Sequence, residues 1–97
     1  MNITERITSI LKIWGASPQQ IQNVVDSGNL ELQREHISGI EECLQMLYPD
    51  SSRKVSFLKQ PSKSVFFEGK KPIDVICSGD EAMLSEAHYI IRSMLCV

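Results

Sequence analysis

The sequence predicts an all-α fold, a small single-domain bundle of about six helices. Apolar residues recur at intervals of three and four along most of the 97-residue chain, which is the spacing of one helix face. Capping residues, prolines and glycines divide this pattern into short segments. The most strand-like run, Val65-Phe66-Phe67, is too short to predict a strand. The length and an apolar content of 42% fit one globular domain.

The first two helices are predicted between residues 3 and 28. Residues 3–14 carry a single apolar stripe, with Asn2 as the cap and Gly15 as the end. The next helix begins at Ser17-Pro18-Gln19-Gln20, which supplies a cap, a proline at the first helical position and a glutamine at the third. We expect it to stop at Ser27-Gly28 after about two turns.

A longer third helix is predicted from its cap, Asn29, to Tyr48, where Pro49 stops it. Gly39 lies inside this helix and costs about 1 kcal/mol relative to alanine. This glycine therefore marks either a close contact with another helix or a break. The apolar face consists of Ile37, Ile40, Cys43, Leu44, Leu47 and Tyr48.

Asp50 is predicted to cap a fourth helix that ends at Lys59 or Gln60, because Pro61 restricts the residue before it. We expect its inward side chains to be Val55 and Leu58, with Phe57 beside them.

The last third of the chain begins with a segment, residues 61–71, that has no regular period. Pro72 then opens a brief helix, and Ser78-Gly79 closes it. Asp80 caps the final helix, which has the clearest amphipathic pattern of the sequence: Met83, Leu84, Ala87, Ile90, Ile91, Met94 and Leu95.

Charge is unevenly distributed along the chain. The net charge of −2 and the pI near 5.6 argue against a dedicated nucleic-acid binder. Residues 51–71 nevertheless carry a balance of +5, whereas residues 1–49 and residues 72–97 carry −3 each. Such a basic block is either a solvated face or a binding surface. Its basic residues are Arg53, Lys54, Lys59, Lys63, Lys70 and Lys71.

Three cysteines without a C-x-x-C pair, Cys43, Cys77 and Cys96, predict reduced thiols. The N-terminal residues do not form a signal peptide, and no apolar run is long enough to cross a membrane. We therefore expect a cytoplasmic protein without membrane contact.

Residues typical of catalysis are few. His36 and His88 are the two histidines, and neither lies in a metal-binding spacing such as H-E-x-x-H. We expect a half-buried structural His36 and a partly solvent-facing His88. Cys43 and Cys77 fall on apolar faces, where cysteine acts as a small hydrophobe. The sequence predicts a protein that is not an enzyme and uses no cofactor and no metal.

A family resemblance is carried mainly by the second half of the chain. Residues 66–80, FFEGKKPIDVICSGD, resemble a motif of the Xre/MbcA/ParS-type antitoxin family: aromatic, glycine, two variable positions, proline, aliphatic, acidic, and a glycine before the last helix. Upstream, Phe57-Leu58 and Pro61-Ser62 stand where the family commonly has Trp-Leu and Pro-Asn. The order of the first helices predicts a degenerate helix-turn-helix-like part, residues 1–35, and the resemblance implies a toxin-binding part, residues 36–97.

The resemblance also implies a function and a site. Members of the family bind and silence RES-domain toxins, which consume NAD, so we expect this chain to neutralise such a toxin by occluding its active site. Gly69, Pro72, Asp74 and Gly79 would shape the turn and the short helix. An exposed aromatic anchor with a basic rim would contact the toxin, and the predicted residues are Phe66 or Phe67, Lys70, Lys71, Tyr89 and Arg92. Two adjacent rings in an extended segment face opposite ways, so one of them is expected in the core.

Two other functions stay open. One is a transcriptional regulator whose N-terminal helices bind DNA, although residues 29–35 offer one arginine against two glutamates. The other is an orphan dimerisation or regulatory module without a toxin. A homodimer is predicted through the apolar stripes of the helices. A neighbouring toxin gene would separate the antitoxin from the orphan module.

Overall fold

The computed structural model describes residues 2–61 and 67–96, except for the side chain of Cys96. These residues form six α-helices and one 3-10 turn and no strand, so the all-α prediction is confirmed. The elements are α1 (Ile3–Ile13), α2 (Pro18–Val25), α3 (Leu30–Leu47), α4 (Ser51–Lys59), α5 (Pro72–Ile76), α6 (Glu81–Ser93) and η1 (Met94–Cys96).

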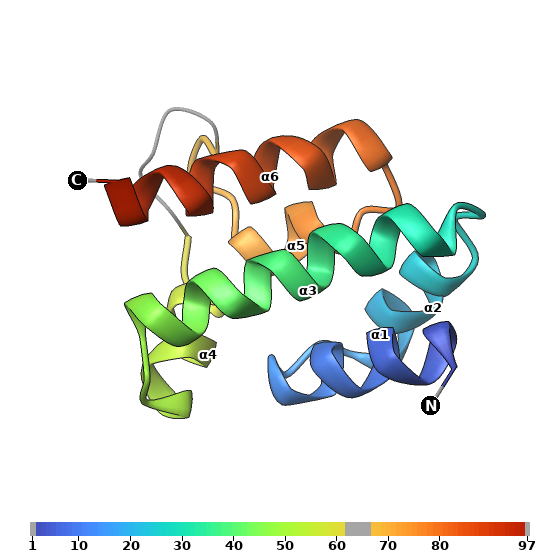
Figure 1. The fold of residues 1–97 in the computed structure, drawn as a ribbon, viewed down its shortest axis with the longest axis horizontal. Helices are drawn as coiled ribbons and strands as arrows, with labels where there is room; N and C mark the ends of the chain where they lie inside the picture. Colours follow the sequence, from blue (N-terminus) through green and yellow to red (C-terminus); the bar gives the residue numbers. More distant parts are fainter. Residues whose placement is uncertain (1, 62–66, 97) are drawn as a thin grey trace.

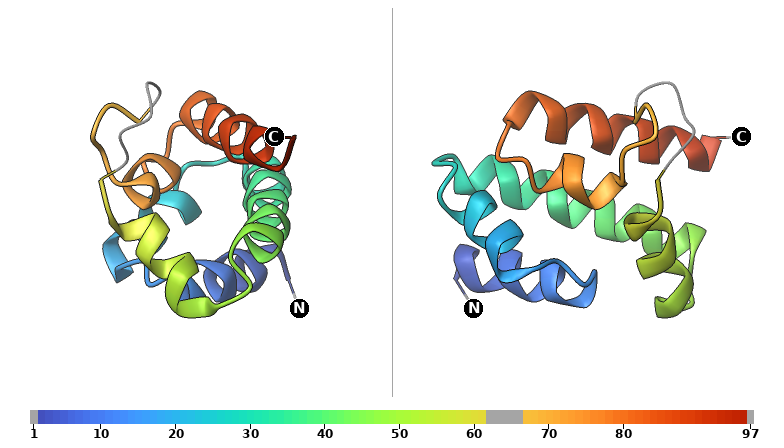
Figure 2. Two further views of the ribbon diagram at one scale, coloured as in Figure 1. Left: turned by 90° about the vertical axis from the view of Figure 1, so that its left-hand side faces the viewer. Right: turned by 180° about the vertical axis from the view of Figure 1, so that it is seen from behind.

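The three longest helices form one side of the molecule. α1, α3 and α6 lie next to one another and run in the same direction, with α3 in the middle (Figure 1). The shorter α2, α4 and α5 close the opposite side, so that the helices surround a common centre when seen end-on (Figure 2). In the described part of the chain, no helix combines the length and the apolar character that crossing a membrane requires.

Side-chain caps fix the starts of the helices where the sequence predicts them. Asn2 accepts a hydrogen bond from the Glu5 amide at 2.8 Å, and Asp80 accepts one from the Ala82 amide at 2.9 Å. At α2, Ser17 and Gln20 form the predicted capping box, in which each side chain bonds the backbone of the other. These bonds satisfy amide groups that would otherwise have no partner at a helix start.

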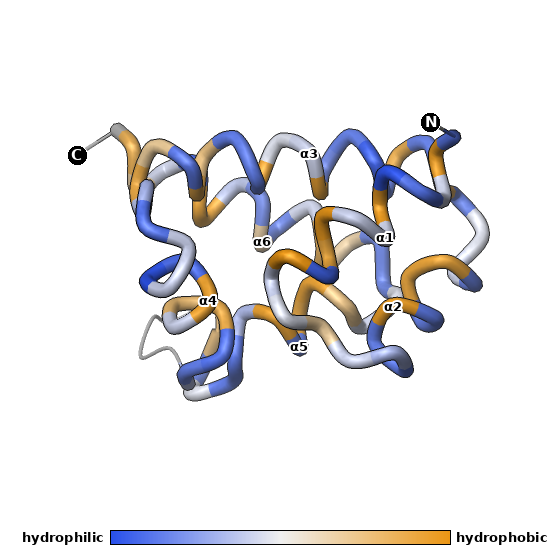
Figure 3. Tube along the Cα trace, turned by 90° about the horizontal axis from the view of Figure 1, so that it is seen from below, coloured by the Kyte–Doolittle hydropathy of each residue, from blue (hydrophilic) through white to orange (hydrophobic). Residues whose placement is uncertain are grey.

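One hydrophobic core joins both halves of the sequence. Trp14 of α1, Ile37 of α3 and Ile91 of α6 are fully buried in it, together with Phe67. Apolar positions recur along each helix (Figure 3), and those of the main stripes are buried in the chain's own core. The apolar stripes through which a homodimer was predicted are therefore occupied by contacts within the chain. The large apolar side chains left exposed among the described residues are Ile13, Met46, Tyr89 and Leu95.

The inward face of α4 differs from the prediction at one position. Leu58 is buried as expected and Val55 is half-buried, but Lys54 is also buried, with 3% of its surface exposed. Lys54 therefore does not belong to a solvated basic face. Its ammonium group finds partners on α3, where it pairs with Glu41 and donates to Gln45 Oε1 at 2.6 Å. A buried lysine is tolerated because these acceptors replace water.

Gly39 marks a close helix contact and not a break, since α3 is continuous through it. A Cβ atom at this position would lie 2.6 Å from Cε1 and Nε2 of His88. The missing side chain leaves room for the His88 ring of α6 against the backbone of α3. Gly39 thus sets how closely the two helices approach.

The turn before α5 depends on left-handed backbone at two successive residues. Glu68 has a φ of +51° and Gly69 a φ of +83°, and the Lys70 amide donates to the Phe67 carbonyl at 2.9 Å. Pro72 follows as the first residue of α5. Glycine accepts this conformation without strain, which explains its place between the buried Phe67 and the helix.

Candidate protein-binding surface

Of the two aromatic residues expected to anchor a toxin, the structure describes one. Phe67 is 1% exposed and belongs to the core, so it cannot be the exposed anchor. The turn at Glu68 and Gly69 directly follows this ring, which packs in the buried core cluster. Phe66 lies outside the described residues. A substitution at Phe67 would therefore test folding and not docking.

The four other predicted contact residues are all exposed, and they come from α6 and from the connection to α5. Tyr89, which is 68% exposed, and Arg92 lie three residues apart on α6. They share the outer face of that helix. Lys71 instead lines a groove with residues from α2, α4 and α5, and no residue of α6 takes part in it. Lys70 is exposed beside Lys71 in the connection to α5.

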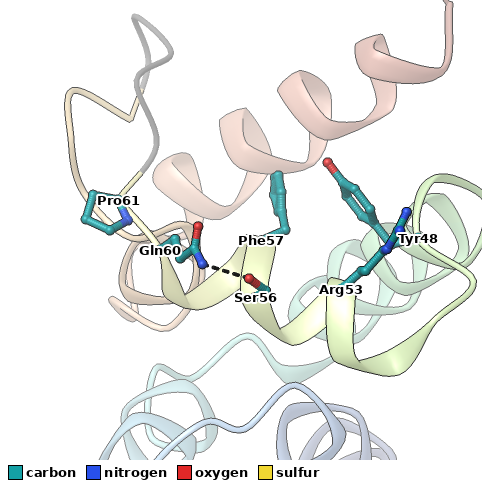
Figure 4. A pocket seen from close by; sticks show the side chains of 6 residues that line it. All are labelled: Tyr48, Arg53, Ser56, Phe57, Gln60 and Pro61. Carbon is teal, nitrogen blue, oxygen red and sulfur yellow. Dashed lines mark hydrogen bonds between the residues drawn. The ribbon is translucent and has the colours of Figure 1, made fainter.

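An open groove with aromatic walls lies at the corner between α3 and α4. It encloses about 350 Å³ and is lined by Tyr48, Arg53, Ser56, Phe57, Gln60 and Pro61. The rings of Tyr48 and Phe57 are 5.2 Å apart between centroids and tilted by 37°, within the range of favourable aromatic pairs. Arg53 lies beside Tyr48, and Gln60 Nε2 donates to Ser56 Oγ at 2.8 Å (Figure 4).

A second open groove of about 370 Å³ separates the end of α4 from the starts of α2 and α5. Lys59 and Lys71 contribute two ammonium groups to its lining, and Asp74 contributes a carboxylate whose Oδ1 accepts from Gln20 Nε2 at 2.7 Å. Lys59 lies against the backbone of Gly15, where a Cβ atom would come within 2.9 Å of its Cε. The positive φ of Gly15, +84°, and its missing side chain make this position available to the lysine.

Both grooves are lined in part by α4, and we give the name α4 face to the basic and aromatic residues that line them. It is defined by Tyr48, Arg53, Phe57, Lys59 and Lys71. Arginine, tyrosine and phenylalanine are residues that protein interfaces favour. Sequence reasoning identified the basic residues but missed the pairing of Tyr48 with Phe57, because that pairing depends on the angle between α3 and α4.

The surface that would meet DNA in a helix-turn-helix protein has the opposite charge. At the start of α3, Glu31 and Glu35 are exposed, whereas Gln33 is buried and donates from Nε2 to Ser27 Oγ at 2.9 Å. Carboxylates at this position repel phosphate groups. The α2–α3 unit therefore offers a helical scaffold but not a basic recognition surface.

The titratable groups in the interior are few. Burial, with a smaller contribution from the Asp74 carboxylate, raises the pKa of Cys77 to about 12. His36 and His88 face each other across α3 and α6. Among residues 2–61 and 67–96, histidine, cysteine and acidic side chains do not gather in threes as a metal site would need.

Comparison with known proteins adds no relative to this picture. No protein-family model, no curated protein and no solved structure matches this chain.

Proposed function

We propose that this protein acts by binding another protein, and that its partner is a RES-domain toxin whose active site it occludes. The toxin is named on the basis of the sequence motif at residues 66–80, FFEGKKPIDVICSGD. The observation that supports a binding role is the α4 face, where two open grooves, an aromatic pair and exposed basic residues adjoin one short helix.

Charge indicates what kind of partner surface the α4 face fits. Arg53, Lys59 and Lys71 are exposed there, and Lys70 precedes Lys71 in the chain. Asp74 is held by Gln20 and is the one carboxylate that lines either groove among the described residues. A partner with an acidic surface and a protruding apolar side chain is complementary to this arrangement. The outer face of α6, with Tyr89 and Arg92, is the second surface that the proposal includes.

The test first searches the neighbourhood of the gene for a RES-domain protein and then attempts to capture that protein with the full chain as bait. Three variants separate the surfaces. Lys59→Glu/Lys71→Glu reverses the charge of the α4 face, and Tyr89→Ala/Arg92→Ala removes the contact pair of α6. Lys12→Glu is the matched control, because Lys12 is an exposed lysine of α1 outside both grooves.

We expect the charge reversal on the α4 face to weaken toxin binding by about tenfold or more and to restore NAD consumption, because like charges would then face each other. The Lys12→Glu control should bind as the wild type does. Loss of binding by the α6 variant alone would move the contact to α6. A wild-type chain that neither binds the toxin nor slows its NAD consumption would reject the proposed function, and a gel shift on operator DNA with steep salt dependence would favour the regulator instead.

A further inference from the structure

The contact between α3 and α6 contains both histidines of the sequence. Nδ1 of His36 lies 2.9 Å from Nδ1 of His88, and the two rings meet edge to face, with centroids 5.2 Å apart and an interplanar angle of 80°. Both side chains are half-buried. α3 and α6 run side by side in Figure 1, and the pair joins one helix to the other.

The chemistry of this contact restricts its protonation. A hydrogen bond between two Nδ1 atoms needs one N–H donor and one lone pair, so at least one of the two rings must be neutral. If both rings carried a proton on each nitrogen, two N–H groups and two positive charges would meet at 2.9 Å. The closed contact is therefore incompatible with full protonation.

The backbone of α3 closes one side of the His88 ring. Gly39 of α3 lies directly against it, since a Cβ atom there would be 2.6 Å from Cε1 and Nε2 of the ring. The Gly39 backbone therefore blocks rotation of the His88 ring toward α3, whereas separation of α6 from α3 relieves the repulsion.

Other charged groups act on the pair from the surrounding elements. Burial, His36 and Arg92 lower the pKa of His88 below its ordinary value of 6.5, and Glu42 of α3 opposes them. α5, which also packs on α6, brings Asp74, whose carboxylate is engaged by Gln20. η1 packs on both helices and carries no ionisable group apart from Cys96.

We propose that His36 and His88 form a proton-operated latch, which holds α6 against α3 when at least one ring is neutral and releases it when both rings are protonated.

The direction of the pH effect follows from the lowered pKa. As the pH falls below 6.5, the unfolded or open state takes up a proton that the closed state resists. The closed contact therefore has its full stability above about pH 7.5 and loses it as the pH falls from 6.5 through the lowered pKa of His88. Carboxylates titrate near pH 4, so they contribute little in this window.

Amide hydrogen exchange of the full chain at pH 7.5 and pH 5.5 tests the latch. The rates are converted to protection factors, so that the intrinsic pH dependence of exchange is removed. We expect protection in the second half of α6 to fall by up to about tenfold for each pH unit and each proton involved. Protection in α1, which contacts α3 on its other side, should stay constant.

The double variant His36→Gln/His88→Gln provides the control, because glutamine keeps a hydrogen-bonding side chain but does not titrate. Its α6 protection should be the same at both pH values. If this variant does not fold, the proton NMR titration of the wild type decides, and it should show one of the two histidines titrating below pH 6.5. Three results would each overturn the latch. Protection in α6 of the wild type stays constant between the two pH values, protection falls equally in α1 and α6, or the two histidines titrate independently at ordinary pKa values.

Discussion

The charged side chain of Lys54 is buried, and its bonding partners determine whether the fold tolerates this buried charge. Its ammonium group pairs with Glu41 and donates to Gln45, while the Trp14 indole N–H donates to the other oxygen of Glu41. The three helices α1, α3 and α4 meet at this one carboxylate. A buried pair adds little net stability, but removal of one charge leaves the other without its partner.

We expect Lys54→Met to lower the free energy of unfolding by about 3 kcal/mol, at the lower end for a buried pair because Glu41 remains partly exposed. Adding Glu41→Gln should recover most of this loss, since glutamine still accepts from Trp14 and leaves no unpaired charge. Urea unfolding measures both effects. The neighbouring substitution Arg53→Met, at an exposed arginine, should change stability by no more than about 0.5 kcal/mol. If Lys54→Met and Arg53→Met lower the free energy of unfolding equally, the buried ion pair of Lys54 does not account for the loss.

Cys77 illustrates how burial suppresses the reactivity of a thiol. Because the pKa of Cys77 is raised to about 12 from an ordinary 9.0, its thiolate fraction at pH 8 is about a thousandfold lower than that of an exposed cysteine. We predict that iodoacetamide at pH 8 leaves Cys77 unmodified in the folded chain and modifies it promptly in urea. Mass spectrometry of peptides resolves the site. Rapid modification of Cys77 without unfolding would contradict its placement in the core.

In the contact between α3 and α6, one glycine has two opposing effects on stability. Gly39 weakens α3 as a helix, by about 1 kcal/mol relative to alanine. Its missing side chain also admits the His88 ring, which a Cβ atom would meet at 2.6 Å. Overpacking in such a contact costs about 1–3 kcal/mol. In the wild type, replacement of Gly39 by alanine would therefore lose at least as much stability through crowding as it gains in helix propensity.

A double-mutant cycle separates the two effects. Gly39→Ala in the wild type should leave stability unchanged or lower it by up to about 2 kcal/mol, the difference between crowding and propensity. In a His88→Ala background the ring is absent, and the same substitution should raise stability by about 1 kcal/mol. The coupling between the two positions should thus be at least about 1 kcal/mol, measured by urea unfolding. Additive effects would mean that Gly39 does not serve this contact.

The element boundaries were predictable because the residues that set them are local. Asn29 and Asp50 bond amide groups two or three residues away, so their role can be inferred without tertiary structure. Gly15 and Gly79 end their segments with φ of +84°, which the sequence also indicates. For Gly39, the sequence left a contact and a break equally open, because the choice depends on a ring 49 positions away at His88.

Which residues share a surface in the folded molecule could not be determined from the sequence alone. The basic block at residues 51–71 was visible, but the burial of Lys54 depends on Glu41 and Gln45 of another helix. Likewise the sequence required one of two adjacent rings to be buried, and the packing of the turn against the core selects Phe67. The predicted site residues come from α6 and from the connection to α5, and helix periodicity alone does not give how these two segments are arranged.

The segregation of charge predicts how a partner would approach. Exposed basic residues lie on the α4 face, whereas Glu31, Glu35 and Glu42 are exposed along α3. Such a surface steers an acidic partner and is screened by salt, because the Debye length falls from about 10 Å at 0.1 M to about 3 Å at 1 M.

If the proposed RES-domain toxin is the partner, its association rate should fall about tenfold between 0.05 and 0.5 M salt, as measured by stopped-flow fluorescence. Lys59→Glu/Lys71→Glu should lower the rate at low salt and flatten its salt dependence, while Lys12→Glu should retain most of both. The dissociation rate should change less with salt than the association rate, since steering acts on the encounter. Two results would show that the charges of the α4 face do not guide the partner: an association rate that does not change with salt, or one whose salt dependence is the same in both variants.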